Sequence, residues 1–133
     1  MEFLTVGLLL LVPIVYLVLS VAAIQAGAFG VEGAARHVAR IVADGARSST
    51  DAGSIDRVVR VILDDYGIDA DSAAVTVACE TPACDQAGER VEVSVRARIA
   101  LPLTPAVLGP ESATSLPVEA TATATVSRFA GAG

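Results

Sequence analysis

A long uncharged stretch near the start of the chain limits its possible folds most. From Phe3 to Val31, 29 consecutive residues carry no charged side chain, and Glu2 stands directly before them. The hydrocarbon core of a bilayer is about 30 Å thick and requires about 20 apolar residues in a helix, which Phe3 to Ile24 supplies. Pro13 would disrupt a soluble helix, but membrane helices tolerate proline. We therefore predict a membrane-spanning helix with a kink at Pro13.

Two alternatives to a retained anchor remain. A cleaved secretory signal is one, because the small residues Ala22, Ala23 and Ala26 would suit a signal peptidase. Such a signal has a basic start and an apolar region of about 7–15 residues, whereas this chain begins Met-Glu and has a longer run. A buried core helix is the other alternative. The pattern favours the retained anchor and hence the lipid bilayer as a partner.

The rest of the chain has the composition of an ordinary, mildly acidic domain. Of the 24 charged residues, 23 lie in the last 102. The net charge of −6 has the wrong sign for a nucleic-acid binder, which needs a basic surface to displace counterions from phosphates. One histidine and no lysine leave few groups for catalysis. We therefore expect no nucleic-acid partner, no enzyme activity, no small-molecule substrate, no cofactor and no metal.

The predicted helix does not end where the apolar run ends. Five residues, spaced three or four apart, share one helical face: Ala28, Val31, Ala35, Val38 and Val42. Charged residues occupy another face, and Glu32 and Arg36 form a favourable pair four residues apart. We predict one helix from about Phe3 to Gly45, followed by a loop over residues 48–53. This divides the chain into an assembly helix, residues 1–27, and an exterior α+β domain, residues 28–133.

A second amphipathic helix follows that loop. Ser54 is a candidate N-cap, and Gly67 is a natural C-terminal stop. Between them, apolar residues recur at helical spacing: Ile55, Val58, Val59, Ile62, Leu63 and Tyr66.

The hydrophobic period then changes from helical to alternating. Three segments place apolar and polar residues in turn: Val75–Cys79, Val91–Ile99 and Val118–Val126. A proline-rich stretch, 101–110, separates the last two segments, and its prolines cannot donate to a sheet ladder. The pattern predicts an α+β fold: a long N-terminal membrane helix that continues as an amphipathic helix, a second short helix, and a small antiparallel sheet of about three strands.

Two cysteines lie at the expected turn between the first two strands. Cys79 and Cys84 are too few for a tetrahedral zinc site, and their spacing is not that of a Cys-x-x-Cys redox motif. Behind a membrane anchor, such a pair favours a short-loop disulfide in an oxidising exterior compartment. Two free thiols, or metal or redox chemistry, remain alternatives.

Three other features have a simple interpretation and a functional one. The acidic residues that follow the second helix, Asp64, Asp65, Asp69 and Asp71, indicate a solvated loop, with a weak calcium site as the alternative. His37 is expected on the surface of the long helix, with a catalytic or ligand role as the alternative. For Glu2 the simple interpretation is an exposed acid in the headgroup region, and the functional one is a paired carboxylate, because a carboxylate at the mouth of an apolar run is costly if it enters lipid and such residues commonly have a partner.

The start of the chain resembles the pilins of type IV-type systems, and more narrowly the TadE-like, pilin-like proteins of tight-adherence pili. The resemblance rests on Glu2-Phe3-Leu4-Thr5-Val6-Gly7 through Leu11-Val12-Pro13, and on Ala26 to Arg40. The stretches Val75 to Cys84 and Val93 to Leu108 add to it. It implies a pilin-like fold in which Glu2, with Phe3 beside it, docks the subunit by pairing with a neighbour's N-terminal amine.

The resemblance also implies a basic leader with a peptidase-site glycine. In this sequence Met1 directly precedes Glu2, and we expect the codons upstream to encode that leader. Arg36, Arg40 and Arg47 follow the apolar run, so the positive-inside rule alone would place the C-terminal side in the cytoplasm. The cysteine pair and the resemblance indicate the opposite orientation, since a basic leader would add the charges that determine topology.

These observations predict a single-pass protein of the cell membrane with an extracellular C-terminal domain. The favoured function is that of a TadE-like subunit that takes part in assembling a tight-adherence pilus. Its partners would be other pilin-like subunits and the assembly machinery. The alternative is an anchored exterior binding domain or assembly factor that never enters a filament.

Overall fold

The structure is a computed structural model that describes residues 1–44, 52–102 and 114–129. Its elements in chain order are α1 (Glu2–Ala43), α2 (Ala52–Asp65), a short 3₁₀ helix η2 (Ala70–Ser72), β1 (Ala74–Cys79), β2 (Arg90–Ala100) and β3 (Ser115–Thr125). The predicted α+β class is confirmed: a long apolar helix, a second helix and a three-stranded antiparallel sheet.

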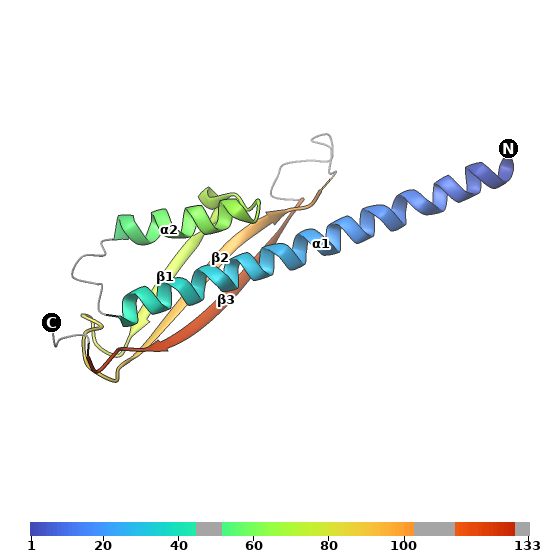
Figure 1. Cartoon of the computed structure of the whole chain (residues 1–133). Coiled ribbons are helices and arrows are strands. Elements are labelled where there is room, and N and C mark those ends of the chain that lie inside the picture. The colour runs from blue at the N-terminus through green and yellow to red at the C-terminus, as the bar shows by residue number, and fades with distance from the viewer. Residues whose placement is uncertain (45–51, 103–113, 130–133) are drawn as a thin grey trace.

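The helix α1 is one continuous element of 42 residues, about 63 Å long at the usual rise. It runs through Pro13 without a break, and its N-terminal half extends well beyond the rest of the molecule (Figure 1). The predicted kink at Pro13 stays a prediction. At the other end, the backbone N–H of Ser127 donates to the carbonyl of Ala43 at 3.0 Å. This bond joins the end of α1 to the chain that follows β3.

The three strands form an antiparallel meander in the order β1-β2-β3. Val93 at the centre of β2 lies opposite Val77 of β1 and Ala122 of β3. The strand β3 begins at Ser115, earlier than the predicted Val118, and therefore includes Pro117. Because β3 is an edge strand, a proline there need not remove a ladder hydrogen bond. The proline-rich connection lies mainly outside the described residues.

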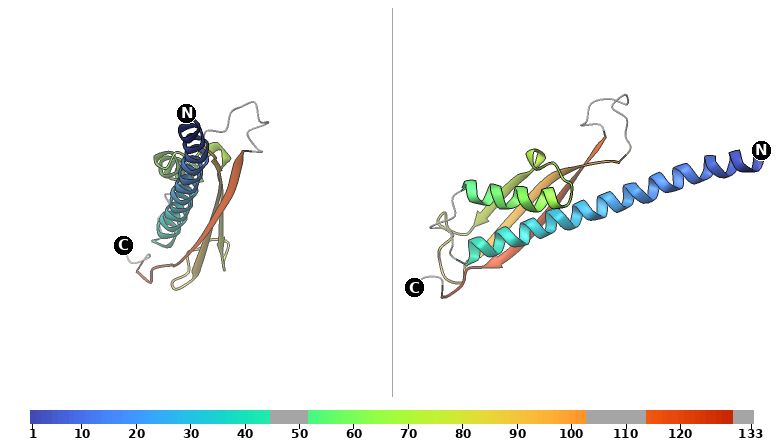
Figure 2. Two further views of the ribbon diagram at one scale, coloured as in Figure 1. Left: turned by 90° about the vertical axis from the view of Figure 1, so that its right-hand side faces the viewer. Right: turned by 45° about the horizontal axis from the view of Figure 1, so that its top comes forward.

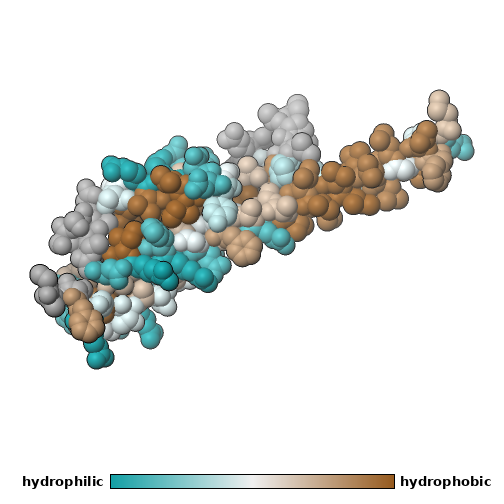
Figure 3. All heavy atoms as spheres, viewed as in Figure 1, coloured by the Kyte–Doolittle hydropathy of each residue, from teal (hydrophilic) through white to brown (hydrophobic). Residues whose placement is uncertain are grey.

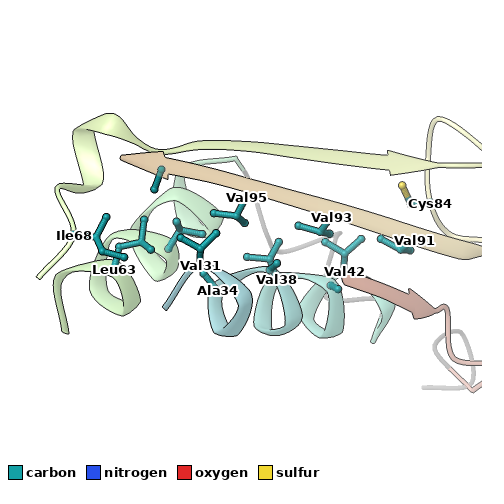
Figure 4. Close-up of a cluster of buried hydrophobic side chains, with 14 of the residues drawn as sticks. Val31, Ala34, Val38, Val42, Leu63, Ile68, Cys84, Val91, Val93 and Val95 are labelled. Carbon is teal, nitrogen blue, oxygen red and sulfur yellow. The ribbon is translucent and has the colours of Figure 1, made fainter. Parts of the chain in front are cut away.

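Both helices lie on the same face of the sheet, with α1 along it and α2 beside α1 (Figure 2). The core between the layers consists mostly of valine and alanine, and Val38 and Val42 of α1 face Val91 and Val93 of β2 (Figure 4). These four side chains are at most 1% exposed. The sheet therefore has one dry face, as the alternating pattern predicted.

The opposite face of the sheet is polar. The hydroxyls of Ser94 and Thr121 lie 2.9 Å apart on neighbouring strands. Next to them, Arg96 of β2 forms an ion pair with Glu119 of β3 at 2.6 Å. Cross-strand pairs of this kind stabilise a sheet modestly, and they leave this face suited to water.

The buried face of α1 differs from the predicted one in one respect. Ala28 is exposed, whereas Gly27 and Gly30 are buried. A Cβ added at Gly27 would lie 2.6 Å from Cγ1 of Ile99, and one added at Gly30 would lie 2.8 Å from Cγ of Tyr66. The prediction followed apolar side chains, whereas these two buried positions have no side chain and leave no room for one.

The start of α2 was predicted too late, while its end was predicted correctly. The helix begins at Ala52, so Ser54 lies in its first turn rather than at the N-cap; alanine at this point favours helix. Gly67 adopts a left-handed φ of +68°, and its N–H donates to Asp64 while that of Ile68 donates to Leu63. This is the Schellman arrangement in which glycine ends a helix. It brings the apolar side chain of Ile68 into the core beside Leu63 (Figure 4).

Candidate functional site

The exposed half of α1 is the most unusual surface of the molecule. Its most apolar stretch has a mean hydropathy of 2.7, and none of it is buried. Figure 3 shows this half as a continuous apolar rod that projects from a more polar domain. Soluble monomers rarely expose apolar patches larger than a few hundred Å². By length and composition α1 can cross a membrane.

The residues to which the resemblance assigns a docking role lie at the free tip of this rod. Glu2 is exposed in the first turn of α1, where the positive end of the helix dipole favours a carboxylate. Phe3 beside it is 90% exposed. The tip lies far from the sheet (Figure 1). Within one copy, Glu2 and Phe3 therefore lie away from their own domain.

The predicted disulfide is present. Cys79 at the end of β1 is bonded to Cys84, with the two Cα atoms 5.4 Å apart. The bond closes the turn between β1 and β2, and Cys84 packs into the core near Val91 (Figure 4). This is the end of the sheet near the C-terminus of α1, so the disulfide and Glu2 lie at opposite ends of the molecule.

A buried carboxylate beside this disulfide was not predicted. Glu89 is only 4% exposed. It accepts hydrogen bonds from the N–H and hydroxyl of Thr81, the latter at 2.8 Å, and from the N–H of Gln86 at 3.3 Å. The alternation of β2 offered a signal, because stepping back from Val91 by two residues places position 89 on the buried face. Glu89 thus holds the turn that the disulfide closes.

A shallow apolar groove lies between the two helices. Its volume is about 490 Å³. Residues from both helices and from the turn after α2 line it: Gly33, His37, Arg57, Val58, Val61, Ile62 and Tyr66. Val61 and Tyr66 are 59% and 47% exposed, and an apolar patch is visible over this region in Figure 3. His37, expected on the surface, is exposed there.

Of the four acids predicted to follow the second helix, Asp64 and Asp65 instead form the end of α2, while Asp69 and Asp71 are engaged with their own chain. The carboxylate of Asp69 accepts a hydrogen bond from the N–H of Asp71 at 3.0 Å. Arg60 pairs with Asp56 at 2.8 Å and Asp71 at 2.7 Å, and these bonds, that to Asp56 foremost, raise the pKa of Arg60 above its usual value. Within the ranges that the structure describes, no three His, Cys, Asp or Glu side chains are grouped to hold a metal ion.

A scan of protein families, a search of curated proteins and a search of solved structures find no match to this chain. The resemblance to TadE-like proteins therefore stays a prediction, and the function must be argued from the arrangement of the residues.

Proposed function

We propose that this protein is a single-pass, pilin-like subunit of the TadE-like kind that takes part in assembling a tight-adherence pilus and has no enzymatic role. One observation carries the proposal. A single uninterrupted helix provides an exposed apolar rod with its first half and the core of an α+β domain with its second.

The continuity of α1 matters because it couples the anchor rigidly to the domain. The second half of the helix contributes nine buried residues, from Gly27 to Ala43. An anchor joined through a flexible linker would let its domain tumble, whereas an ordered assembly requires each subunit to present its domain in one orientation. The packing of α1 on β2 and β3 supplies that fixed relation.

The position of Glu2 fits the same role. A carboxylate next to lipid is costly unless it is paired, and no other acidic or basic side chain occurs before Glu32. We therefore take its partner from an adjacent subunit. The N-terminal amine of an adjacent subunit is a cation at a matching depth, because single-pass copies insert in the same orientation.

The disulfide supports an exterior domain. Disulfides form and persist in oxidising compartments and are rare in the cytosol, and Cys79 and Cys84 form one here. The proposed topology places the tip with Glu2 toward the cytoplasm and the α+β domain outside.

Replacement of Glu2 tests the proposed function. The Glu2→Ala protein should still be found in the membrane fraction. Cells of the native host that carry this substitution should have few or no surface pili when they are counted by electron microscopy. Glu80→Ala, which removes an exposed carboxylate from the domain, is the matched control and should leave the pili intact. Normal piliation with Glu2→Ala would contradict the proposal.

The groove between α1 and α2 favours a second candidate, an anchored exterior domain that binds a partner without entering a filament. Its apolar residues, Val58, Val61 and Ile62, would receive apolar side chains of that partner. In this case Glu2→Ala would have little effect, whereas Val61→Asp, at a position 59% exposed, would abolish binding.

A further inference from the structure

Exposed apolar side chains gather at the end of the domain where the apolar half of α1 leaves it. Among the residues that the structure describes, five large apolar side chains beyond Val21 are exposed: Phe29, Val61, Tyr66, Leu116 and Phe129. Val61 lies in the groove between the helices. Phe129 lies two residues after Ser127, which is bonded to the C-terminal end of α1. The remaining three come from α1, from the turn after α2 and from β3.

Phe29 and Tyr66 lie on different sides of α1. Phe29 is 66% exposed, whereas Gly27 and Val31, each two residues away from it, are buried against the domain. Because residues two apart on a helix point to nearly opposite sides, Phe29 points away from the sheet. Tyr66 lies beside α1 at Gly30, where an added Cβ would be 3.0 Å from the Cβ of the tyrosine. Tyr66 therefore covers the side of α1 that is next to α2.

Leu116 reaches the same level from the sheet. It lies opposite Ile99 in the register of β2 and β3, and cross-strand partners share a face of the sheet. Ile99 meets α1 at Gly27, where an added Cβ would be 2.6 Å from Cγ1 of the isoleucine. Gly27 is two residues from Phe29, about 3 Å along the axis. Leu116, Phe29 and Tyr66 thus lie around α1 at nearly one level, and we name them the apolar collar.

The uncharged run of α1 extends to the level of the apolar collar. From Phe3 to Val31 it is about 43 Å long as a helix, which matches a bilayer with both of its headgroup regions, about 40–45 Å. Phe29 lies two residues before the end of this run, and helical side chains point toward the N-terminus, here back toward the apolar rod. With the run in the membrane, the apolar collar lies in the headgroup region on the domain's side.

We propose that the apolar collar inserts into the headgroup region of the bilayer and gives the domain a second membrane contact beside its anchor. Phenylalanine and leucine are typical of surfaces that enter this region, and tyrosine is enriched there because its ring is apolar and its hydroxyl is polar. Side chains at this depth help to determine the tilt of a membrane helix. Contacts on several sides of α1 therefore hold the domain in one orientation on the membrane.

The contact is apolar rather than electrostatic. Asp64 and Asp65 directly precede Tyr66, and both are exposed. Acidic side chains do not bind the anionic lipids that attract basic segments to a membrane surface. Neutral phosphatidylcholine is therefore sufficient for the contact, and salt, which screens charges, leaves it in place.

The inference rests on the membrane anchor of the proposed function, and tryptophan quenching in vesicles tests the two separately. The chain contains no tryptophan, so a single substituted residue reports alone. Phe29→Trp, Tyr66→Trp and Leu116→Trp report on the apolar collar. Phe129→Trp is the matched control, because Phe129 is an exposed aromatic residue away from the collar. Leu10→Trp reports on the anchor itself.

Each full-length variant is reconstituted in phosphatidylcholine vesicles that carry bromine either near the headgroups or near the bilayer centre. We expect the shallow bromines to quench the three collar variants at least about threefold more than Phe129→Trp, both in low salt and in about 0.5 M salt. The deep bromines should quench Leu10→Trp.

The outcomes separate the collar from the anchor. If Leu10→Trp is quenched but Tyr66→Trp and Leu116→Trp are quenched no more than Phe129→Trp, the collar is refuted and the anchor stands. Quenching of Phe29→Trp alone also refutes the collar, because Phe29 belongs to the anchoring helix. Quenching of the collar variants that disappears in salt refutes an apolar contact. If Leu10→Trp is not quenched, the anchor fails and the collar with it.

A second substitution tests whether the collar residues act together. Adding Leu116→Gln to Tyr66→Trp removes an apolar side chain that is 40% exposed, and it should reduce the shallow quenching at least about twofold, because apolar area buried in the interface sets the strength of the contact. Val61→Gln changes an exposed apolar residue of the groove and should leave the quenching unchanged. Equal quenching with and without Leu116→Gln would overturn the joint contact.

Discussion

At the scale of single residues, Glu89 shows how the domain uses a buried charge. The residue is 4% exposed and directly precedes β2, and its carboxylate accepts hydrogen bonds from Thr81 and Gln86. Burial of an acid is costly unless hydrogen bonds compensate it. Here they link the two ends of the turn between β1 and β2, so that Glu89 and the Cys79–Cys84 bond constrain the same segment.

We predict that Glu89→Gln destabilises the domain by about 1–3 kcal/mol. The NH₂ group of glutamine would replace a carboxylate oxygen that accepts hydrogen bonds, so its own N–H groups would face other donors. Urea unfolding of the full chain in detergent, followed by circular dichroism, measures the change. Glu80→Gln alters an exposed acid in the same turn and should shift stability by less than about 0.5 kcal/mol. Similar effects of the two variants would show that Glu89 is not specifically held.

At the scale of elements, the approach of α1 to α2 depends on glycine. A Cβ at Gly30 would lie 3.0 Å from Cβ of Tyr66. That atom is fixed to the backbone, so rotation of the tyrosine ring cannot relieve the contact and the helices would have to separate. Gly33, one turn further along, has nothing within 4 Å of the same hypothetical atom.

Gly30→Ala and Gly33→Ala should therefore change stability in opposite directions. Alanine improves a helix by about 1 kcal/mol relative to glycine, and at Gly33 this gain is unopposed. At Gly30, overpacking costs about 1–3 kcal/mol and exceeds the gain, so the variant should be less stable than the parent. Thermal unfolding in detergent measures whether each variant is more or less stable than the parent. Stabilisation by Gly30→Ala would contradict the close approach.

At the scale of the whole molecule, the protein is an apolar rod joined to a domain without a hinge. The apolar part from Phe3 to Ile24 is about 33 Å long as a helix, close to the roughly 30 Å of a bilayer core. Burial against the sheet begins at Gly27. The domain would therefore stand directly at the membrane surface, with the sheet along the continuation of the anchoring helix.

The proposed orientation predicts that the domain is accessible from outside the cell. Thr123 is exposed on the polar face of β3, and a cysteine at this position should react with a membrane-impermeant maleimide in intact cells. Labelling should reach the level seen after lysis. Labelling that requires lysis would place the domain in the cytoplasm, as the arginines after the apolar run would suggest.

The order of apolar and polar residues along the chain was enough to predict the elements and the polarity of their faces. Helical and alternating periods are local properties, so the long helix, the stop at Gly67 and the three strands could be read without knowing their neighbours. The bond between Cys79 and Cys84 was predicted from their place at a turn between two such strands together with the membrane helix expected in front of them.

Features that arise where two surfaces meet could not be predicted in this way. The closeness at Gly27 and Gly30, the burial of Glu89 and the groove between α1 and α2 all arise where elements distant in the sequence come together. Periodicity shows which face of α1 is apolar, but not which neighbour covers it. In the first half of that helix no element of the described chain does.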